Sequence, residues 1–410
     1  MGFKRRFFLF LIILGLSCHL FAQSRHFVLK KNFEKIEIPF TFANGLMLVK
    51  VHYNEHLFLW FILDTGAENT ILVHKELATL MGVQFRREFT IIGSDLSTEL
   101  TAYLTLGNTL EFGGLTIRNH PILVLDEDYF NFQERTGLEI HGIIGADVFK
   151  RFMVGINYRS KVLTLYNPER FSSPKGKYKR IPIDIIKNKP YINADVDIQK
   201  DTLSTVQKLL LDTGSATALL LQTNSDTSLA LPGNVIKTPI AFGLGGNLEG
   251  YRGRIHELRL GSFQLANVTA IFQKLPEAYN GRSTHRDGII GNEILSHFHI
   301  LIDYINSALY LAPNRNFKDE FVYDKSGLTL ASGKNESSVL VTYVVPNSPA
   351  DKAGVKKGDI IKKINRLPVN FYGLGEIAAK LKKRNGKKIR LKVRRDGKAM
   401  VFVFRLQDLI

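Results

Sequence analysis

The stretch "FILDTGAENT", from Phe61 to Thr70, places Asp64 at the end of an apolar run. A carboxylate at the end of a buried strand is costly unless the protein pairs it or uses it. The stretch "LLLDTGSATA", from Leu209 to Ala218, repeats this arrangement around Asp212. Thr and Gly follow the aspartate in both stretches, and Gly permits the positive φ of a tight turn. Such a turn would aim each carboxylate outward from the end of its strand.

The two stretches belong to an internal repeat. The segment "HGIIGADVFKRFMVGINYRSKVLTLYNP" (141–168) follows the first aspartate, and "DGIIGNEILSHFHILIDYINSALYLAPN" (287–314) follows the second. The offset is 148 residues between the two aspartates and 146 between the closing glycines of the GIIG blocks. Landmarks at a nearly constant offset predict two lobes that share one fold.

Short apolar or alternating segments separated by Gly or Asn predict strands in both halves. Each half opens with an Ile-Pro pair, Ile38-Pro39 and Ile181-Pro182, and each GIIG block precedes one predicted short helix. We therefore expect a mostly β protein with two pseudo-symmetric lobes and a C-terminal α+β domain. The expected boundaries are 23–170 and 171–320 for the lobes and 321–410 for the last domain.

The repeat also predicts a chemistry. Two lobes related by an approximate two-fold axis would bring the Asp64 and Asp212 turns face to face. Two neighbouring carboxyl groups share one proton and titrate as a pair. The charged member can then take a proton from water, while the protonated member donates to the carbonyl oxygen under attack. This pattern predicts hydrolysis of peptide bonds by a monomer, with no metal or other cofactor.

Two Asp-Thr-Gly triplets, each followed by an apolar-apolar-Gly block, resemble the aspartic proteases. The similarity is to the retropepsin-like branch in its single-chain, two-lobe bacterial form, over roughly 30–315. The resemblance implies that Asp64 and Asp212 are catalytic. It also implies that threonine hydroxyls bond across the lobe interface and that the apolar-Gly turns pack behind the aspartate loops. The implied supporting residues are Thr65, Gly66, Thr213, Gly214, Ile144, Gly145, Ile290 and Gly291.

A flap is expected between the aspartate and the GIIG block of a lobe. "TIIGSDLSTEL" (90–100) and "AFGLGGNLEG" (241–250) both place Gly between apolar segments, as a mobile hairpin tip needs. The candidate flap residues are Gly93, Ser94, Gly243, Gly245 and Gly246. His297 and His299 lie two residues apart, but the repeat aligns them with Arg151 and Met153. We therefore expect structural roles for these histidines and no metal site.

Residues 322–410 have a different composition from the rest of the chain. They hold 20 Lys/Arg and 7 Asp/Glu, whereas residues 23–321 hold 32 and 31, so the net charge of +17 is concentrated near the C-terminus. In "VVPNSPADKAGVKKGDIIKKINRLPV" (344–369), Ser-Pro-Ala predicts a helix start and the following Gly its end. A helix over 375–383 and a hairpin around Asp396-Gly397 follow.

This last segment resembles a PDZ domain of the bacterial protease-associated kind. The resemblance implies that an extended peptide pairs with a sheet edge and that backbone N–H groups hold its terminal carboxylate. "KSGLTL" (325–330) is the best match for the carboxylate loop, although it departs from the usual GLGF pattern. The implied peptide-binding residues are Ser326, Gly327, Leu328 and Leu330.

The basic charge of the C-terminal domain suits acidic chain ends or an anionic surface such as lipid headgroups. Nucleic-acid binding is not expected, because the segment lacks interleaved exposed aromatic residues. At the N-terminus, Lys4, Arg5 and Arg6 precede an apolar run, and Ala22 offers a cleavage position. This predicts a signal peptide over 1–22 and export to the periplasm or the exterior. The alternative is a lipoprotein that is acylated at Cys18. Gly15 argues against this alternative, because lipoprotein signals usually have Leu at that position.

The sequence thus predicts an exported aspartic endopeptidase whose PDZ domain binds peptides or substrate tails. The alternative is a catalytically silent protein that uses the lobes and the PDZ domain as a peptide-binding scaffold. Both Asp-Thr-Gly triplets are intact, so nothing in them indicates a loss of chemistry.

Overall fold

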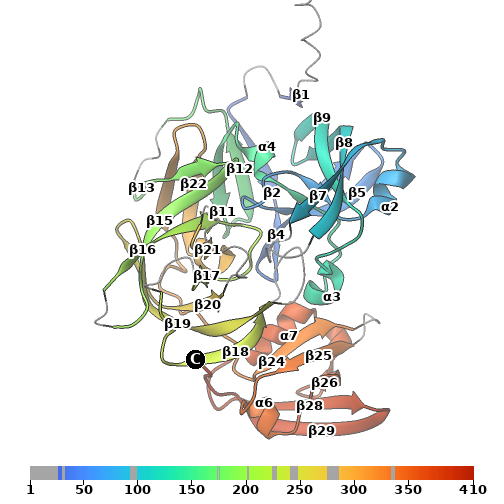
Figure 1. The fold of residues 1–410 in the computed structure, drawn as a ribbon, viewed down its shortest axis with the longest axis vertical. Helices are drawn as coiled ribbons and strands as arrows, with labels where there is room; N and C mark the ends of the chain where they lie inside the picture. The colour runs from blue at the N-terminus through green and yellow to red at the C-terminus, as the bar shows by residue number, and fades with distance from the viewer. Residues whose placement is uncertain are drawn as a thin grey trace, which may run out of the picture.

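The computed structural model describes residues 26–29, 33–92, 99–172, 174, 176–200, 203–223, 229–240, 248–274, 286–333 and 338–410. Strands form most of this part of the chain (Figure 1). The predicted signal peptide, 1–22, lies outside the described residues. Among the described helices, none is long and apolar enough to cross a membrane.

The first lobe has one sheet of its own, with short helices between its strands, and contributes β2, β11 and β12 to a sheet that it shares with the second lobe. Its strands and helices are β1 (His26–Val28), β2 (Lys35–Pro39), β3 (Thr41–Ala43), β4 (Leu46–Tyr53), β5 (Leu57–Leu63), β6 (Ile71–Leu72), α2 (Lys75–Leu80), β7 (Phe85–Ile92), β8 (Glu99–Phe112), β9 (Leu115–Leu125), α3 (Phe132–Thr136), β10 (Gly142–Ile144), α4 (Ala146–Phe149), β11 (Met153–Asn157) and β12 (Val162–Tyr166).

The second lobe repeats this order. Its strands and helix are β13 (Lys179–Pro182), β14 (Asp184–Ile186), β15 (Lys189–Asp197), β16 (Thr205–Leu211), β17 (Leu219–Gln222), β18 (Val235–Ile240), β19 (Leu248–Leu260), β20 (Phe263–Gln273), β21 (Gly288–Ile290), α5 (Asn292–Leu295), β22 (Phe298–Asp303) and β23 (Ala308–Pro313). The predicted short helices after the GIIG blocks are α4 and α5.

The two lobes share one topology around their aspartates. In lobe 1, β10 lies between β5, to which it is parallel, and β6, to which it is antiparallel. In lobe 2, β21 lies between β16 and β17 in the same way. Even the register is equal, since Gly142 is opposite Phe61 and Gly288 is opposite Leu209. The prediction of two lobes with one fold is therefore confirmed.

A third sheet joins the lobes, in the strand order β13-β23-β22-β11-β12-β2. At its centre β11 and β22 run antiparallel, and Gly155 is opposite Leu301. These two residues are separated by 146 positions, which is the offset of the repeat, so the pseudo-two-fold axis passes between them. One apolar core continues through both lobes and includes Phe61, Leu209 and Phe321. This shared core fixes the lobes against each other.

The C-terminal domain has its own core and a sheet in the order β24-β25-β26-β28-β29. Its elements are β24 (Leu328–Ser332), β25 (Val339–Val344), α6 (Pro349–Lys352), β26 (Ile360–Ile364), β27 (Leu367–Pro368), the 3-10 helix η2 (Val369–Phe371), α7 (Leu374–Leu381), β28 (Lys388–Arg395) and β29 (Lys398–Arg405). The Ser348 hydroxyl caps α6 by accepting from the Asp351 N–H.

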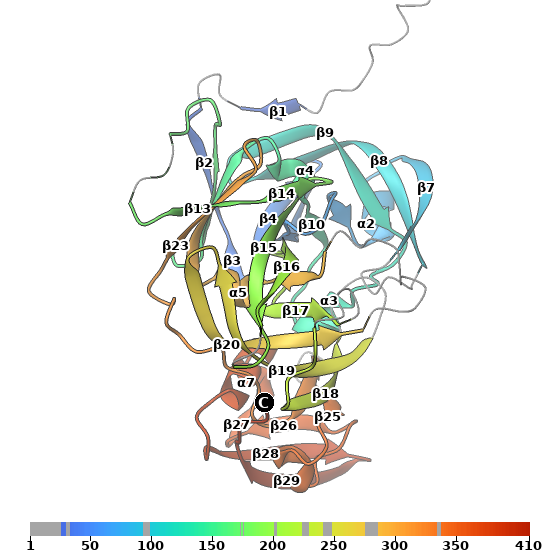
Figure 2. The ribbon, with the colours of Figure 1, turned by 60° about the vertical axis from the view of Figure 1, so that its left-hand side comes forward.

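The C-terminal domain lies beneath both lobes, next to α3 of lobe 1 and to β18 and β19 of lobe 2 (Figures 1 and 2). On the lobe 2 side, the Arg254 guanidinium donates to the carbonyl oxygens of Phe321 (2.9 Å) and Ile410 (3.3 Å). On the lobe 1 side, the Asn44 side chain contacts Gly375 at the start of α7. The domain therefore closes one end of the space between the lobes.

Candidate active site

Asp64 and Asp212 lie where β5 and β16 end, at equivalent points of the two lobes. The Asp64 N–H donates to the Ile144 carbonyl and the Asp212 N–H to the Ile290 carbonyl, both at 3.0 Å. Each aspartate therefore continues the pairing of its strand with the GIIG block, which explains why that block accompanies it in the sequence. The two carboxyl groups hydrogen-bond to each other across the lobe interface.

Thr65 and Thr213 join the two aspartate loops through four hydrogen bonds. The Thr65 N–H donates to the Thr213 hydroxyl at 3.0 Å, and the Thr213 N–H donates to the Thr65 hydroxyl at 3.1 Å. Each hydroxyl also donates to the opposite lobe, Thr65 to Leu211 O (2.7 Å) and Thr213 to Leu63 O (2.8 Å). Both threonines are 1% exposed. This threonine brace fixes the separation of the two aspartates.

The glycines of the Asp-Thr-Gly triplets allow the carboxyl groups to meet. A Cβ atom on Gly66 would lie 2.6 Å from Cγ of Asp212, and one on Gly214 would clash with Asp64 in the same way. The same glycines donate to the aspartate beside them, Gly66 N to Asp64 Oδ1 (2.6 Å) and Gly214 N to Asp212 Oδ1 (2.8 Å). Any larger residue would push the carboxyl groups apart.

The GIIG glycines are required by close packing of the backbone behind the aspartates. A Cβ atom on Gly142 would lie 2.5 Å from the Ile71 carbonyl oxygen, and one on Gly145 would overlap the Asn69 carbonyl. The Ala146 N–H donates to Ala67 O (2.8 Å), as the Asn292 N–H does to Ser215 O in lobe 2. The supporting turns that contain Ile144-Gly145 and Ile290-Gly291 thus lie directly behind the two aspartate loops.

The electrostatic environments of the two carboxyl groups differ. Burial raises the pKa of Asp64 well above its usual value, and the negative charge of Asp212 raises it further. Burial also raises the pKa of Asp212, but the hydrogen bond from Asp64 and the positive charges of Arg286 and Lys189 act in the opposite direction. The positive charges beside Asp212 therefore favour the ionised form of that carboxyl group and the shared proton on Asp64.

Sequence reasoning missed these two cations. Lys189 begins β15 at the position where Leu46 begins β4, and Arg286 stands two residues before its GIIG glycine, where lobe 1 has Ile140. Burial lowers the pKa of Lys189, and the nearby charge of Arg286 adds to this effect. A position-by-position comparison of the two repeats would have found both residues, because each replaces an apolar side chain.

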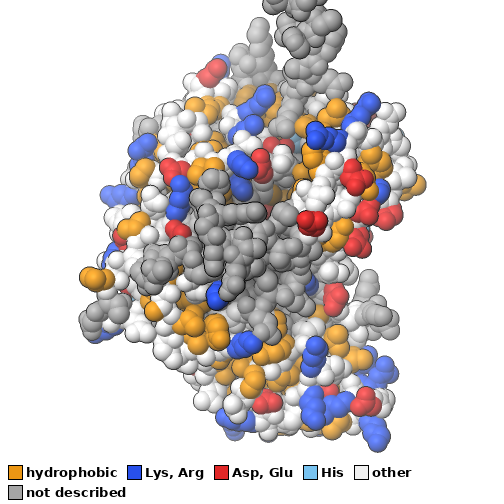
Figure 3. Space-filling model, viewed as in Figure 1, with side chains coloured by type: hydrophobic (Ala, Val, Ile, Leu, Met, Phe, Trp, Pro, Cys, Tyr) orange, Lys and Arg blue, Asp and Glu red, His pale blue; other side chains and the backbone are white. Residues whose placement is uncertain are grey.

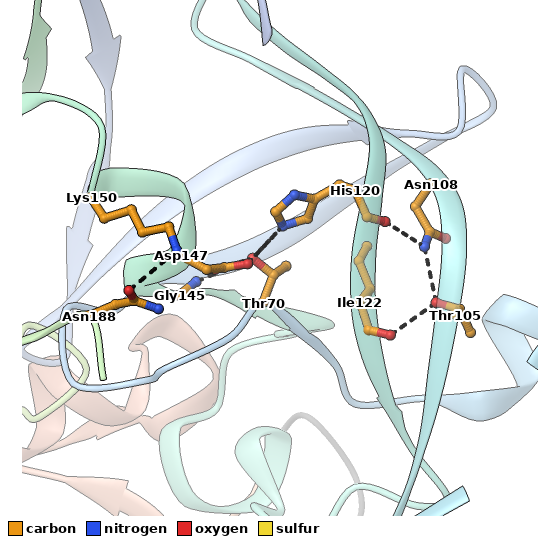
Figure 4. A network of polar contacts seen from close by, with 9 residues as sticks. All are labelled: Thr70, Thr105, Asn108, His120, Ile122, Gly145, Asp147, Lys150 and Asn188. Atoms are coloured by element: carbon orange, nitrogen blue, oxygen red, sulfur yellow. Dashed lines mark hydrogen bonds and ion pairs between the residues drawn. The ribbon is translucent and has the colours of Figure 1, made fainter. Parts of the chain in front are cut away.

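The sequence also did not predict a buried polar network behind the Asp64 loop (Figure 4). The Thr70 hydroxyl donates to Asp147 Oδ1 (3.1 Å) and lies 3.1 Å from His120 Nε2, which is itself 3.1 Å from Asp147 Oδ2. All three side chains are at most 2% exposed. Lobe 2 uses Asn292 instead, whose side chain contacts the Tyr158 hydroxyl (2.6 Å), Thr213 O (2.6 Å) and Gly45 O (2.7 Å).

The two carboxyl groups face a cleft with a volume of about 2140 Å³. Its described lining comes from both lobes and from the C-terminal domain, including Leu328, Leu330 and Ala378. The candidate flap residues Gly93, Ser94, Gly243, Gly245 and Gly246 lie outside the described residues. In the described part of the chain, no group of three or more His, Cys, Asp or Glu side chains is arranged to hold a metal ion. His297 instead stacks on Phe321, with ring centroids 4.8 Å apart.

The C-terminal domain presents a basic face along β28. Its four outward-facing cations, listed in order, are Lys388, Arg390, Lys392 and Arg394, all of them exposed. No ion pair among the described residues joins these four to a carboxylate. Val403 lies opposite Arg390 and Val401 opposite Lys392 on β29, and both valines are nearly half exposed. Figure 3 shows Lys and Arg side chains distributed over this domain.

Comparisons with known protein families agree with this architecture. The aspartyl protease family model matches residues 49–148 and 194–294, one segment in each lobe, and a PDZ domain model matches 340–395. The two lobes are retropepsin-like aspartyl protease domains, and a PDZ domain follows them. The matched segments contain both Asp-Thr-Gly triplets and both GIIG blocks.

Two curated relatives share part of the chain. The carboxy-terminal processing protease CtpA of Bacillus subtilis is 24% identical over 144 residues, which is 34% of this chain and 31% of CtpA. A probable CtpA-like serine protease of Staphylococcus saprophyticus is 27% identical over 85 residues, 21% of this chain and 17% of that protein. The aligned part thus spans less than a third of either relative. The comparisons support a PDZ-containing protein of protease type, without fixing the catalytic type.

Proposed function

We propose that this protein is an aspartic endopeptidase in which Asp64 and Asp212 activate one water molecule. The observation that carries the proposal is the hydrogen-bonded carboxyl pair at the floor of the cleft, held by the threonine brace. The relative called a probable serine protease shares too little of its length with this chain to argue for a serine mechanism here. Asp-Thr-Gly geometry and the aspartyl protease match both favour the aspartic type.

In the proposed reaction, a water molecule lies between the two carboxyl groups and the peptide carbonyl of the substrate. Ionised Asp212 accepts a proton from this water as the water oxygen attacks the carbonyl carbon. Protonated Asp64 donates its proton to the carbonyl oxygen, which gives a neutral tetrahedral intermediate. The intermediate then collapses as Asp212 gives its proton to the amide nitrogen and Asp64 takes one from a hydroxyl of the intermediate, so that the C–N bond breaks and both carboxyl groups return to their starting protonation. Both aspartates belong to one chain, so a monomer suffices for catalysis.

The test compares the full chain with Asp64→Asn and Asp212→Asn on a diverse peptide mixture from pH 4 to 7.5. Each substitution is expected to lower the cleavage rate by about 10³-fold or more, since a general acid or base is lost. Asp319→Asn, at an exposed position of lobe 2, is the matched control and should leave the rate unchanged. Cleavage that survives both active-site substitutions would assign the activity to another site. An intact wild-type chain that cleaves nothing would favour the peptide-binding scaffold.

We also propose that residues 1–22 are a signal peptide and that the mature protein is exported as lobes 23–170 and 171–320 with a PDZ domain over 321–410. Mass spectrometry of the mature N-terminus tests this directly. A first residue of Gln23 supports cleavage after Ala22. A lipid-modified Cys18 would show a membrane anchor instead.

The basic face along β28 favours an anionic surface as a partner of the exported protein. Four unpaired cations flanked by exposed valines match a membrane that contains anionic lipid, at about 1 kcal/mol per cation near the surface. Vesicles of phosphatidylcholine with about 30% phosphatidylglycerol should bind the wild-type chain, because the anionic lipid gives the vesicle surface a negative potential. The change Arg390→Gln with Lys392→Gln should weaken this binding, whereas Lys177→Gln with Lys179→Gln in lobe 2 should not. Equal binding to uncharged vesicles would contradict the proposal.

A further inference from the structure

The carboxylate loop of the PDZ domain already holds a carboxylate of its own chain. Asp324 Oδ1 accepts from the Ser326 N–H (2.9 Å), the Ser326 hydroxyl (2.8 Å) and the Gly327 N–H (2.7 Å). The Leu328 N–H donates to the Ser326 hydroxyl at 3.2 Å. The three backbone donors that a peptide terminus would need are therefore occupied within the loop.

A second carboxylate at this loop would be opposed by charge as well as by the lack of donors. Burial raises the pKa of Asp324 to about 6, although the hydrogen bonds from Ser326 and Gly327 act against the shift. The carboxyl group is thus still ionised at neutral pH. A peptide C-terminus that approached the same N–H groups would meet this like charge.

The groove beside the loop remains open and is part of the catalytic cleft. In the described chain, β24 pairs only with β25, so its other edge has no strand partner. Leu328 and Leu330 on β24 and Ala378 on α7 line the same continuous cavity as Asp64 and Asp212. This placement gives an extended chain one path from the groove to the carboxyl pair.

Lobe 1 contributes the wall at which the groove meets the rest of the cleft. The Asp128 carboxylate accepts from the N–H groups of Phe130 and Phe132 and thereby fixes the start of α3. The residue after α3, Gly137, lies against Leu374 of α7 and Ser332 of β24. The Asn44 side chain donates to Thr136 O (2.6 Å) and also contacts Gly375. Asp128 therefore helps to hold this wall in place.

We propose that the groove between β24 and α7 is a distal substrate subsite of the protease cleft, which binds an internal extended segment of the polypeptide substrate rather than a free C-terminus. The same substrate chain continues past α3 to the carboxyl pair. This inference rests on the proposed function, because it assigns substrate residues remote from the scissile bond to the PDZ domain. It replaces the terminal-carboxylate role that the PDZ resemblance implies for Ser326, Gly327 and Leu328.

Binding is measured on the full chain carrying Asp212→Asn, so that no peptide is cleaved. The probe is a library of acetylated dodecapeptides, each synthesised both with a C-terminal carboxylate and as the C-terminal amide. We expect the dissociation constants of the two forms to agree within about twofold, since no donor awaits the terminus. If the acid forms bind about tenfold more tightly than the amides, the proposal is wrong, because hydrogen bonds to a charged carboxylate strengthen binding by at least that factor. Failure of either form to bind would overturn it as well.

Substitutions of Asp324 test why the acid and amide forms of a peptide are expected to bind equally well. Asp324→Ala frees the Ser326 and Gly327 N–H groups, so it should create a preference of about tenfold for the acid forms. Asp324→Asn keeps an acceptor oxygen on these groups and should leave the two forms within about threefold. Thermal unfolding of both variants establishes that the PDZ domain still folds. An Asp324→Ala chain that folds and still binds both forms equally would contradict the role of Asp324.

The groove wall provides the second test. Ala378→Asp should weaken the binding of both peptide forms at least tenfold, while Ala399→Asp on exposed β29 should not change it. If Ala378→Asp leaves binding unchanged, the peptide lies elsewhere and the proposal fails. These measurements do not depend on catalysis. A chain that binds as expected, yet whose wild type cleaves nothing, would refute the proposed function and leave this inference standing.

Discussion

The two aspartate loops share a backbone and differ in the side chains around it. The brace, the strand register and the GIIG packing are the same in both lobes. Behind Asp64, however, lies the Thr70–His120–Asp147 network, and behind Asp212 lies Asn292. Among the main contributions to the two pKa values, positive charges act on Asp212, through Lys189 and Arg286, and not on Asp64.

The difference shows which features of the site must be the same in both lobes and which must differ. Two carboxyl groups that must meet require the same loop geometry in each lobe, so the brace is symmetric. Acid and base must differ in protonation, and identical surroundings would leave the shared proton with no preferred site. Lys189 and Arg286 break this equivalence by stabilising the charged form of Asp212.

The largest expected effect comes from breaking the symmetric part. Thr65→Val and Thr213→Val each remove a hydroxyl that accepts from one buried N–H and donates to one buried carbonyl. We expect each to lower the free energy of unfolding by about 2–5 kcal/mol, because two buried polar groups lose their partners. Urea unfolding measures this, with Thr41→Val at an exposed position as the control. If the losses in free energy of unfolding for the two variants differ by more than about twofold, the two threonines do not contribute equally to stability.

A smaller effect is expected from the network that lobe 1 alone possesses. Thr70→Val keeps the shape of the side chain but removes its hydrogen bonds to Asp147 and His120. We expect a loss of about 1–3 kcal/mol in the free energy of unfolding. Thr217→Val, in the part-buried lobe 2 pair with Ser215, should cost less than about 1 kcal/mol. Equal costs would mean that the buried network adds nothing to lobe 1.

The smallest effect should come from the cations that make the pair unequal. Lys189→Leu restores the residue type of lobe 1, and Arg286→Gln removes the other charge. Both positive charges lower the pKa of Asp212, so either change raises that pKa and less Asp212 is ionised at low pH. The acid limb of the kcat/KM profile should therefore move to higher pH, by up to about 1 unit.

Arg159→Gln, an exposed change in lobe 1, is the control for this shift and should leave the pH profile in place. A shift of the acid limb to lower pH in either cation variant would contradict the assignment of Asp212 as the base. An unchanged profile would show that the lobes differ in charge without differing in role.

Much of the scaffold could be predicted from particular residues. Two Asp-Thr-Gly triplets and two GIIG blocks at nearly equal offsets predicted two lobes, and short apolar or alternating segments predicted that both lobes consist mostly of strands. Gly142 and Gly145 show why these signals are strong, since the backbone passes too close behind them for any side chain. The occupation of the carboxylate loop by Asp324 could not be predicted, because a PDZ resemblance specifies the loop and not which acceptor fills it.

By itself, the sequence determined the repeat, the strand pattern, the basic C-terminal domain and the two acids at the ends of equivalent strands. These are local or periodic properties, which residue type and spacing carry directly. Only the tertiary structure decided that the carboxyl groups share a hydrogen bond, that Lys189 and Arg286 stand beside one of them, and that the PDZ groove opens into the same cleft. Each of those facts depends on how distant segments pack together, and Coulomb energies and hydrogen bonds vary with distances that no linear pattern records.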